Sequence, residues 1–422
     1  MNRTTATALL FLLTWPTSLV ADDPFNWTPA EGLDDRLPLE IAAALQLPPG
    51  DFINLPVLFD ETVNSLDMVR VDLTQQPAGA SPIVIATGSI FALGPAVQLG
   101  DRVGSSFVDG SFDLRFGGCD APCATTFNLP VNVGTWIDSS SAASSGNLFV
   151  AGLDNGADHE ISLFHSTTNG WQLLNSYAPG EPGGVYDNFH GGKRIQVIVD
   201  PLATDPATTR NCLFFETRPA PGTTTALHLK CNEGIVGVFD TTLDTDVPNP
   251  LGMFDRTIET ACLPIRTSLG QLETLCTYTH RQTLQIRAVH VDDAGKASAP
   301  VTLGPVPAGA DFYKTAAVPY GDFDEVGFTF PVQSEMAAMS VHWNRDAGSF
   351  AQTAPEFDPG PVSASRFTSD IIDPRRYLFG VRLAFQREGV GEGFLVMSRG
   401  RVPIFFDGFE TQNLLRWSNH VP

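Results

Sequence analysis

The chain reads Cys212-Leu-Phe-Phe-Glu-Thr-Arg-Pro-Ala-Pro-Gly-Thr-Thr-Thr-Ala-Leu-His-Leu-Lys-Cys231, two strand-like runs around a Pro-Gly turn signal. The second run alternates apolar and polar residues up to Lys230, which is typical of a half-buried β-strand. An antiparallel hairpin centred between Pro221 and Gly222 places Cys212 directly opposite Cys231. This stretch therefore predicts a β-hairpin joined by a cross-strand disulfide.

The other cysteines follow the same local pattern. A three-residue loop with glycine at its left-handed position, Ser268-Leu269-Gly270, centres a second hairpin and sets Cys262 opposite Cys276. Local pairs indicate disulfides in an oxidising compartment. The alternative is a metal site, which typically uses Cys-x-x-Cys spacings with neighbouring histidines. The expected disulfides are Cys119–Cys123, Cys212–Cys231 and Cys262–Cys276.

Strand-like runs, each followed by a Gly-containing turn and further strands, recur along the chain. They begin near Asn147, Cys212, Cys262, Val326 and Tyr377, with weaker copies near Met68 and Ser111. A repeat of three or four strands is typical of a β-propeller blade, and about seven copies fill the chain. The pattern resembles secreted bacterial β-propellers. The expected fold is all-β, a propeller of about seven blades, with tandem β-sandwiches as the alternative.

The chain divides into four parts at the sequence level. Residues 1–21 read as a secretory signal peptide, because Arg3 precedes an apolar run and Leu19-Val20-Ala21 supplies a small-residue cleavage site. Residues 22–60 form an N-terminal segment with one predicted helix, Leu37–Leu45, that ends before Pro48-Pro49. Residues 61–401 carry the propeller-like repeats, and residues 402–422 form a tail. The protein is expected to be secreted or periplasmic, with a retained anchor as the alternative reading of the N-terminus.

Composition limits the classes of partner. The chain has 47 Asp and Glu against 25 Lys and Arg, giving a formal net charge of −22. This charge repels nucleic acid and anionic lipid. No apolar run is long enough to span a membrane as a helix. The partner is therefore expected to be a glycan or a protein, and the protein is expected to be a monomer without a membrane span.

The tail reads Asp407-Gly-Phe-Glu410 followed by Trp417-Ser418. It resembles the endings of many exported proteins of gammaproteobacteria, and this resemblance implies export without implying an activity. The sequence departs from such tails at Thr411-Gln412-Asn413, which lacks the glycine that commonly follows the acid. The alternative is that apolar residues such as Phe405 form a last strand that closes the fold.

Residues with binding chemistry gather in one Gly-rich stretch, 177–194. Aromatic, amide, imidazole and basic side chains on a loop of a rigid β scaffold are typical of a binding site, and the alternative is a solvated connection between blades. Two further clusters surround Trp343 and Arg376. The candidate ligand-binding residues are Tyr186, Asn188, His190, Arg194, Trp343 and Arg376.

Acidic clusters provide a candidate metal site. Asp322, Asp324 and Glu325 lie in Tyr320-Gly-Asp-Phe-Asp-Glu, which is similar to the calcium loop of integrin-type propeller repeats, although Val326 replaces one oxygen ligand. Asp240, Asp244 and Asp246 form another cluster of alternating acids. The alternative for each cluster is a loop that is acidic by chance, as expected in an acidic protein. The sequence therefore predicts no required cofactor, and calcium is the one candidate. Paired carboxylates would also suit a glycosidase, which needs them across a cleft.

No recognisable catalytic motif is present. The sequence lacks a Gly-x-Ser-x-Gly elbow and a phosphate-binding Gly-x-x-x-x-Gly-Lys, and His159-Glu160 lacks the spacing of a zinc protease helix. This favours an exported binding or scaffold protein for a neutral glycan or a protein. The alternative is an exported propeller-type hydrolase or lyase that acts on polysaccharide.

Overall fold

The computed structural model describes most of the chain between residues 26 and 401. The described residues are 26–27, 31–36, 38–41, 45–47, 52–59, 61–72, 79–120, 123–155, 160–177, 195–200, 202–217, 224–248, 261–266, 271–280, 283, 285–305, 316–320, 325–332, 337–344, 349–352, 367–369, 379–388 and 392–401.

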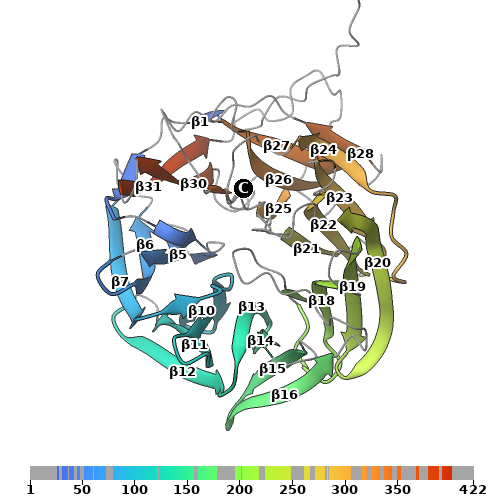
Figure 1. The fold of residues 1–422 in the computed structure, drawn as a ribbon, viewed down its shortest axis with the longest axis horizontal. Helices are drawn as coiled ribbons and strands as arrows, with labels where there is room; N and C mark the ends of the chain where they lie inside the picture. Colours follow the sequence, from blue (N-terminus) through green and yellow to red (C-terminus); the bar gives the residue numbers. More distant parts are fainter. Residues whose placement is uncertain are drawn as a thin grey trace, which may run out of the picture.

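Seven antiparallel sheets make up these residues, and Figure 1 shows them as blades arranged in a ring. We number the blades along the chain. Blade 1 contains β3 (Pro38–Ile41), β4 (Leu45–Leu47), β5 (Phe52–Phe59), β6 (Ser65–Asp72) and β7 (Gly79–Thr87). Blade 2 contains β8 (Ile90–Phe91), β9 (Val97–Leu99), β10 (Arg102–Asp109), β11 (Leu114–Asp120) and β12 (Thr126–Asn132). Blade 3 contains β13 (Trp136–Ser144), β14 (Asn147–Asp154), β15 (Ile161–Thr167) and β16 (Gly170–Tyr177).

The other blades follow the same strand order. Blade 4 contains β17 (Gln196–Val199), β18 (Arg210–Thr217), β19 (Thr224–Glu233) and β20 (Val236–Pro248). Blade 5 contains β21 (Ala261–Arg266), β22 (Leu272–His280), β23 (Gln285–Val291) and β24 (Val301–Pro305). Blade 6 contains β25 (Ala316–Tyr320), β26 (Glu325–Val332), β27 (Ala337–Asn344) and β28 (Ser349–Gln352). Blade 7 contains β29 (Phe367–Ser369), β30 (Phe379–Glu388), β31 (Glu392–Arg401), β1 (Asn26–Trp27) and β2 (Glu31–Asp34).

The N-terminal strands close the ring. Both β1 and β2 pair with β31, so that Asn26 lies opposite Arg401 and blade 7 is built from both ends of the described chain. The predicted helix Leu37–Leu45 is wrong, because Pro38–Ile41 is strand β3 and pairs with β5. Leu39 and Ile41 lie two residues apart, which places both side chains on the same face of a strand. This spacing indicates a strand rather than a helix. The segment 22–60 therefore contributes strands to the ring.

Burial on both faces of the sheets distinguishes the propeller from tandem sandwiches. In β18, Cys212 and Phe214 pack in a cluster shared with blade 5, whereas Leu213 and Phe215 pack in a cluster shared with blade 3. Further clusters join blades 2 and 3 and blades 1 and 2. A sandwich sheet would pack one face against a single partner. The fold is therefore an all-β propeller, as predicted.

Double-sided burial also explains which strands the sequence repeat detected. A strand that is buried on both faces reads as a continuous apolar run, as at Cys212-Leu-Phe-Phe215. The runs near Asn147, Cys212 and Val326 lie in second strands, whereas the run at Cys262 lies in the first strand β21. The expected start in blade 5 was therefore one strand too early.

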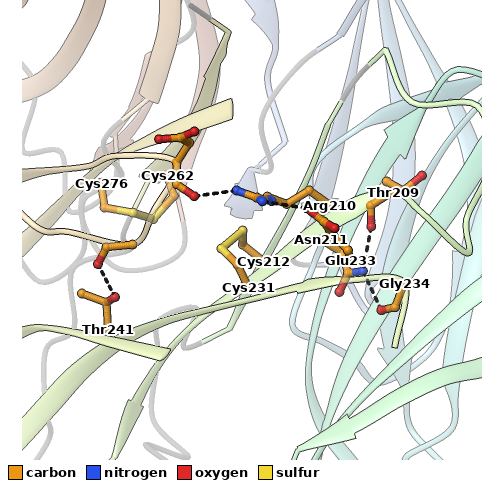
Figure 2. The surroundings of a disulfide bond; sticks show 12 residues. Thr209, Arg210, Asn211, Cys212, Cys231, Glu233, Gly234, Thr241, Cys262 and Cys276 are labelled. Carbon is orange, nitrogen blue, oxygen red and sulfur yellow. Dashed lines mark hydrogen bonds and ion pairs between the residues drawn. A yellow bond between two sulfur atoms is a disulfide. The ribbon is translucent and has the colours of Figure 1, made fainter. Parts of the chain in front are cut away.

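The predicted hairpin registers are confirmed. Cys212 pairs with Cys231 across β18 and β19, and Cys262 pairs with Cys276 across β21 and β22. Disulfides join both pairs, and a third joins Cys119 to Cys123. Figure 2 shows the first two bridges between blades 4 and 5, where both sulfur pairs belong to one buried cluster.

Peptide mapping of the unreduced protein tests these bridges. We expect a Cys212–Cys231 peptide and a Cys262–Cys276 peptide, each of which separates into two on reduction. Free thiols or a crossed pairing such as Cys212–Cys262 would contradict the hairpin register. Cys119–Cys123 serves as the internal reference, because its four-residue separation keeps both cysteines on one peptide.

Alternating strand directions give the ring two faces. The fourth strand of one blade and the first strand of the next meet at one face, which we call the connection face. Tyr177 at the end of β16 and Ile195 just before β17 lie there. Third strands such as β27 end at the opposite face, and second strands such as β26 begin there.

Candidate functional site

The predicted ligand-binding residues fall mostly outside the described part of the chain. Trp343 lies in β27, opposite Val326 and Phe350, near the end of the strand at the face opposite the connection face. The others lie outside the described residues: Tyr186, Asn188, His190, Arg194 and Arg376. Their assignment to a ligand stays a prediction.

The predicted calcium residues also lie mostly outside the described part of the chain. Glu325 opens β26 and lies opposite Tyr320 and Asn344, and Asp322 and Asp324 lie outside the described residues. Over the ranges that the structure describes, no three His, Cys, Asp or Glu side chains come together to hold a metal ion. In those same ranges no helix is long and apolar enough to cross a membrane.

Buried polar side chains fix the first strands of neighbouring blades to one another. Asp138 on β13 accepts a hydrogen bond from the Ile195 amide at 3.1 Å, and the Ser140 hydroxyl accepts one from the Val197 amide at 3.1 Å. Gln196 forms a two-point contact with β21, donating to the Cys262 carbonyl at 2.8 Å and accepting from its amide at 2.7 Å. The start of β17 is therefore held from both sides, immediately after residues 178–194.

The other flank of that stretch is held by a polar and aromatic cluster between blades 3 and 4. Its members, which we call the seam cluster, are Tyr177 of β16, Thr217 of β18, His228 and Lys230 of β19, and Asp240 of β20. The Tyr177 hydroxyl donates to Asp240 Oδ2 at 3.3 Å, and Lys230 Nζ lies 3.9 Å from the centre of the Tyr177 ring. A side chain of blade 3 is thereby tied to two strands of blade 4.

Within the seam cluster, His228 is held on both ring nitrogens. Its Nε2 lies 3.0 Å from Thr217 Oγ1, and its Nδ1 lies 3.5 Å from Asp240 Oδ1. The imidazole also stacks on Phe215, with ring centres 5.2 Å apart and an interplanar angle of 8°. These contacts fix the ring in one orientation.

The hydrogen bond from His228 lowers the pKa of Asp240, and the charges of His228 and Lys230 act in the same direction, against a smaller effect of burial. The carboxylate is therefore ionised at neutral pH. Its contribution to folding is fully present above the ordinary carboxylate pKa of about 4, and is lost as the pH falls through the lower folded value.

The order Thr217, His228, Asp240 has the connectivity of a hydroxyl–imidazole–carboxylate chain. A nucleophilic hydroxyl must be reached by substrate, and Thr217 is only 3% exposed. The chain of contacts therefore orients His228 and links strands β18, β19 and β20, rather than presenting a nucleophile.

The acids of β20 do not form one cluster. A bulge between the pairs Leu227–Asp244 and His228–Thr242 inserts one residue, which turns Asp244 to the face opposite Asp240. Asp244 accepts hydrogen bonds from the Tyr278 hydroxyl at 2.8 Å and from Arg287 at 3.1 Å, both in blade 5. Burial, first of all, raises the pKa of Tyr278 above its usual range. The predicted grouping of Asp240 with Asp244 is therefore wrong.

The seam cluster was not predicted from the sequence. The alternation Ala226-Leu-His-Leu-Lys230 places His228 and Lys230 on one face of a strand, and this was a usable signal. The partner Tyr177 was within the predicted binding stretch, but nothing in the sequence connects it to Asp240. The pairing depends on how blades 3 and 4 pack.

No protein-family model and no curated protein matches the chain. Several solved β-propellers are similar in structure. AofleA from Arthrobotrys oligospora gives a TM-score of 0.48 at 13% identity, over 81% of this chain and 96% of that one. The fucose-specific lectin from Aleuria aurantia gives 0.45 at 13% identity, over 78% and 99%. The β-propeller domain of the Trilobed protease from Pyrococcus furiosus gives 0.45 at 9% identity, over 89% and 100%.

Proposed function

We propose that the protein is an exported binding protein whose ligand is a neutral glycan, contacted by residues 178–194, which follow β16 and precede β17 in the sequence. One observation carries the proposal: both flanks of this stretch are fixed, Tyr177 by the seam cluster and Ile195 by the buried carboxylate of Asp138. Long connections between fixed strand ends are a common place for binding residues.

The residue types of the stretch support the same ligand class. Residues 177–194 contain Tyr186, Asn188 and His190, which combine an aromatic ring with hydrogen-bonding groups, as sugar binding requires. The net charge of −22 disfavours polyanionic ligands. Export is supported by the signal-like N-terminus and by the three disulfides, which persist in oxidising compartments.

A glycan array followed by calorimetry on the purified protein tests the proposal. We expect the wild type to bind a neutral oligosaccharide without cleaving it, and the Tyr186→Ala/His190→Ala variant to lose at least tenfold in affinity. The double variant should keep the wild-type circular dichroism spectrum and melting temperature, because the described contacts that hold β16 and β17 are left unchanged.

The matched control is Thr168→Ala/Asn169→Ala, in the turn between β15 and β16 at the opposite face of blade 3. This variant should bind like the wild type. Absence of binding to every neutral glycan would overturn the proposal. Release of reducing ends from a bound polysaccharide would favour the hydrolase alternative instead.

A further inference from the structure

The seam cluster presents a hydrogen-bond acceptor beside a hydrogen-bond donor. Asp240 and Lys230 lie directly opposite each other across β19 and β20. The side chain of Asp240 is 40% exposed and Lys230 is half-buried, so both are accessible to a small ligand. Side chains at directly paired positions project from Cβ atoms about 5 Å apart.

Both side chains are held in place before any ligand arrives. Asp240 is contacted on its two oxygens by His228 and Tyr177, and the Lys230 ammonium group lies over the Tyr177 ring. Tyr177 in turn packs on Phe215, with ring centres 4.8 Å apart. A preorganised pair of polar groups loses little side-chain entropy on binding.

The two ligand-facing side chains of the cluster, Asp240 and Lys230, carry opposite charges. The Asp240 carboxylate lies opposite the Lys230 ammonium group, so these two charges cancel, and the Tyr177 hydroxyl adds no charge. An anion would meet the carboxylate, and a cation would meet the ammonium group, so either would carry an opposing interaction. A neutral ligand that donates one hydrogen bond and accepts another at adjacent atoms satisfies both groups.

We propose that the seam cluster is a subsite for a vicinal diol of a neutral sugar. One hydroxyl donates to Asp240, and the neighbouring hydroxyl accepts from Lys230. The subsite deepens the proposed glycan binding and rests on it, because it lies at Tyr177, where the stretch 178–194 begins. It assigns to Asp240 and Lys230 a role that the sequence did not indicate.

Titration of the full-length mature protein with methyl α-D-mannopyranoside, which carries vicinal hydroxyls, tests the subsite. We expect binding by the wild type and at least a tenfold loss of affinity in Asp240→Asn and in Lys230→Met. The 2,4-dideoxy analogue of the sugar, which keeps no two neighbouring hydroxyls, is expected to bind at least fivefold more weakly. Glycine and sulfate, a zwitterion and an anion, are expected to show no binding.

The control variant is Glu233→Gln, which removes an exposed ion pair with Arg210 at the last residue of β19. It should bind the sugar like the wild type. If seam variants and the wild type bind glycans equally, the subsite is wrong while the proposed function stands. If the wild type binds no neutral glycan at all, both are wrong. Binding of glycine or sulfate in place of the sugar would also overturn the diol assignment.

Discussion

Replacing Arg36 with Met is expected to lower the free energy of unfolding by about 2–4 kcal/mol. Arg36 follows β2, the N-terminal strand that completes blade 7, and contacts three carboxylates. Its guanidinium lies 2.8 Å from Asp34, 2.9 Å from Glu61 and 2.9 Å from Asp67. Since Glu61 and Asp67 belong to blade 1, this one side chain joins the closing strand to the first blade.

The size of the effect follows from burial. The side chain of Asp67 is 1% exposed, so losing Arg36 leaves a carboxylate in the interior without an opposite charge, held by the hydrogen bond that the Ser65 hydroxyl donates to it. Arg36 also lies over the Phe59 ring, 3.8 Å from its centre, and its hydrogen bond to Asp34 raises its pKa above the usual range. The expected loss stays below that of a fully buried pair, because Arg36 itself is 26% exposed.

Urea unfolding followed by tryptophan fluorescence measures the difference. The matched control is Arg115→Met, which removes an ion pair of 3.0 Å to Asp109 with both partners about a quarter exposed, and should cost at most about 1 kcal/mol. Adding Asp67→Asn to Arg36→Met should restore part of the loss, because the unpaired charge is gone. Equal stability of Arg36→Met and Arg115→Met would show that the ion pairs do not hold the ring closed.

The features that were predictable from sequence are local ones. Turn chemistry and cysteine spacing fix the register of Cys212 against Cys231, since both depend on fewer than two dozen consecutive residues. Ring closure was not predictable, because Asn26 pairs with Arg401 across almost the whole chain. No sequence pattern in the N-terminal or the C-terminal segment indicates that the two segments pair.

The candidate site shows the same division. Alternation along β19 indicates that His228 and Lys230 share a face, but it does not indicate that Tyr177 of another blade completes the cluster. The bulge in β20 likewise could not be predicted from a run of alternating acids. Because of it, Asp240 faces blade 3 and Asp244 faces blade 5. Contacts between blades, which build the site, depend on packing rather than on local pattern.

Replacing Asp138 with Ala is expected to cost about 2–4 kcal/mol and to weaken glycan binding, because Asp138 supports two backbone amides in the interior. Its carboxylate, in a residue that is 5% exposed, accepts hydrogen bonds from the Ser139 amide at 2.7 Å and the Ile195 amide at 3.1 Å. Alanine leaves both donors without this acceptor and releases the strand end that follows residues 178–194.

The matched variant is Ser140→Ala on the same strand, which removes one hydrogen bond, to the Val197 amide, two residues further into β17. It should cost about 1 kcal/mol and leave glycan affinity unchanged, since the Ile195 contact remains. Urea unfolding and calorimetry with the glycan, below the unfolding transition of each variant, separate the two effects. If Asp138→Ala binds the glycan like Ser140→Ala, then the anchoring of β17 does not position the binding residues. The hydrogen bond between Asp138 and the Ile195 amide would then no longer support the proposed function.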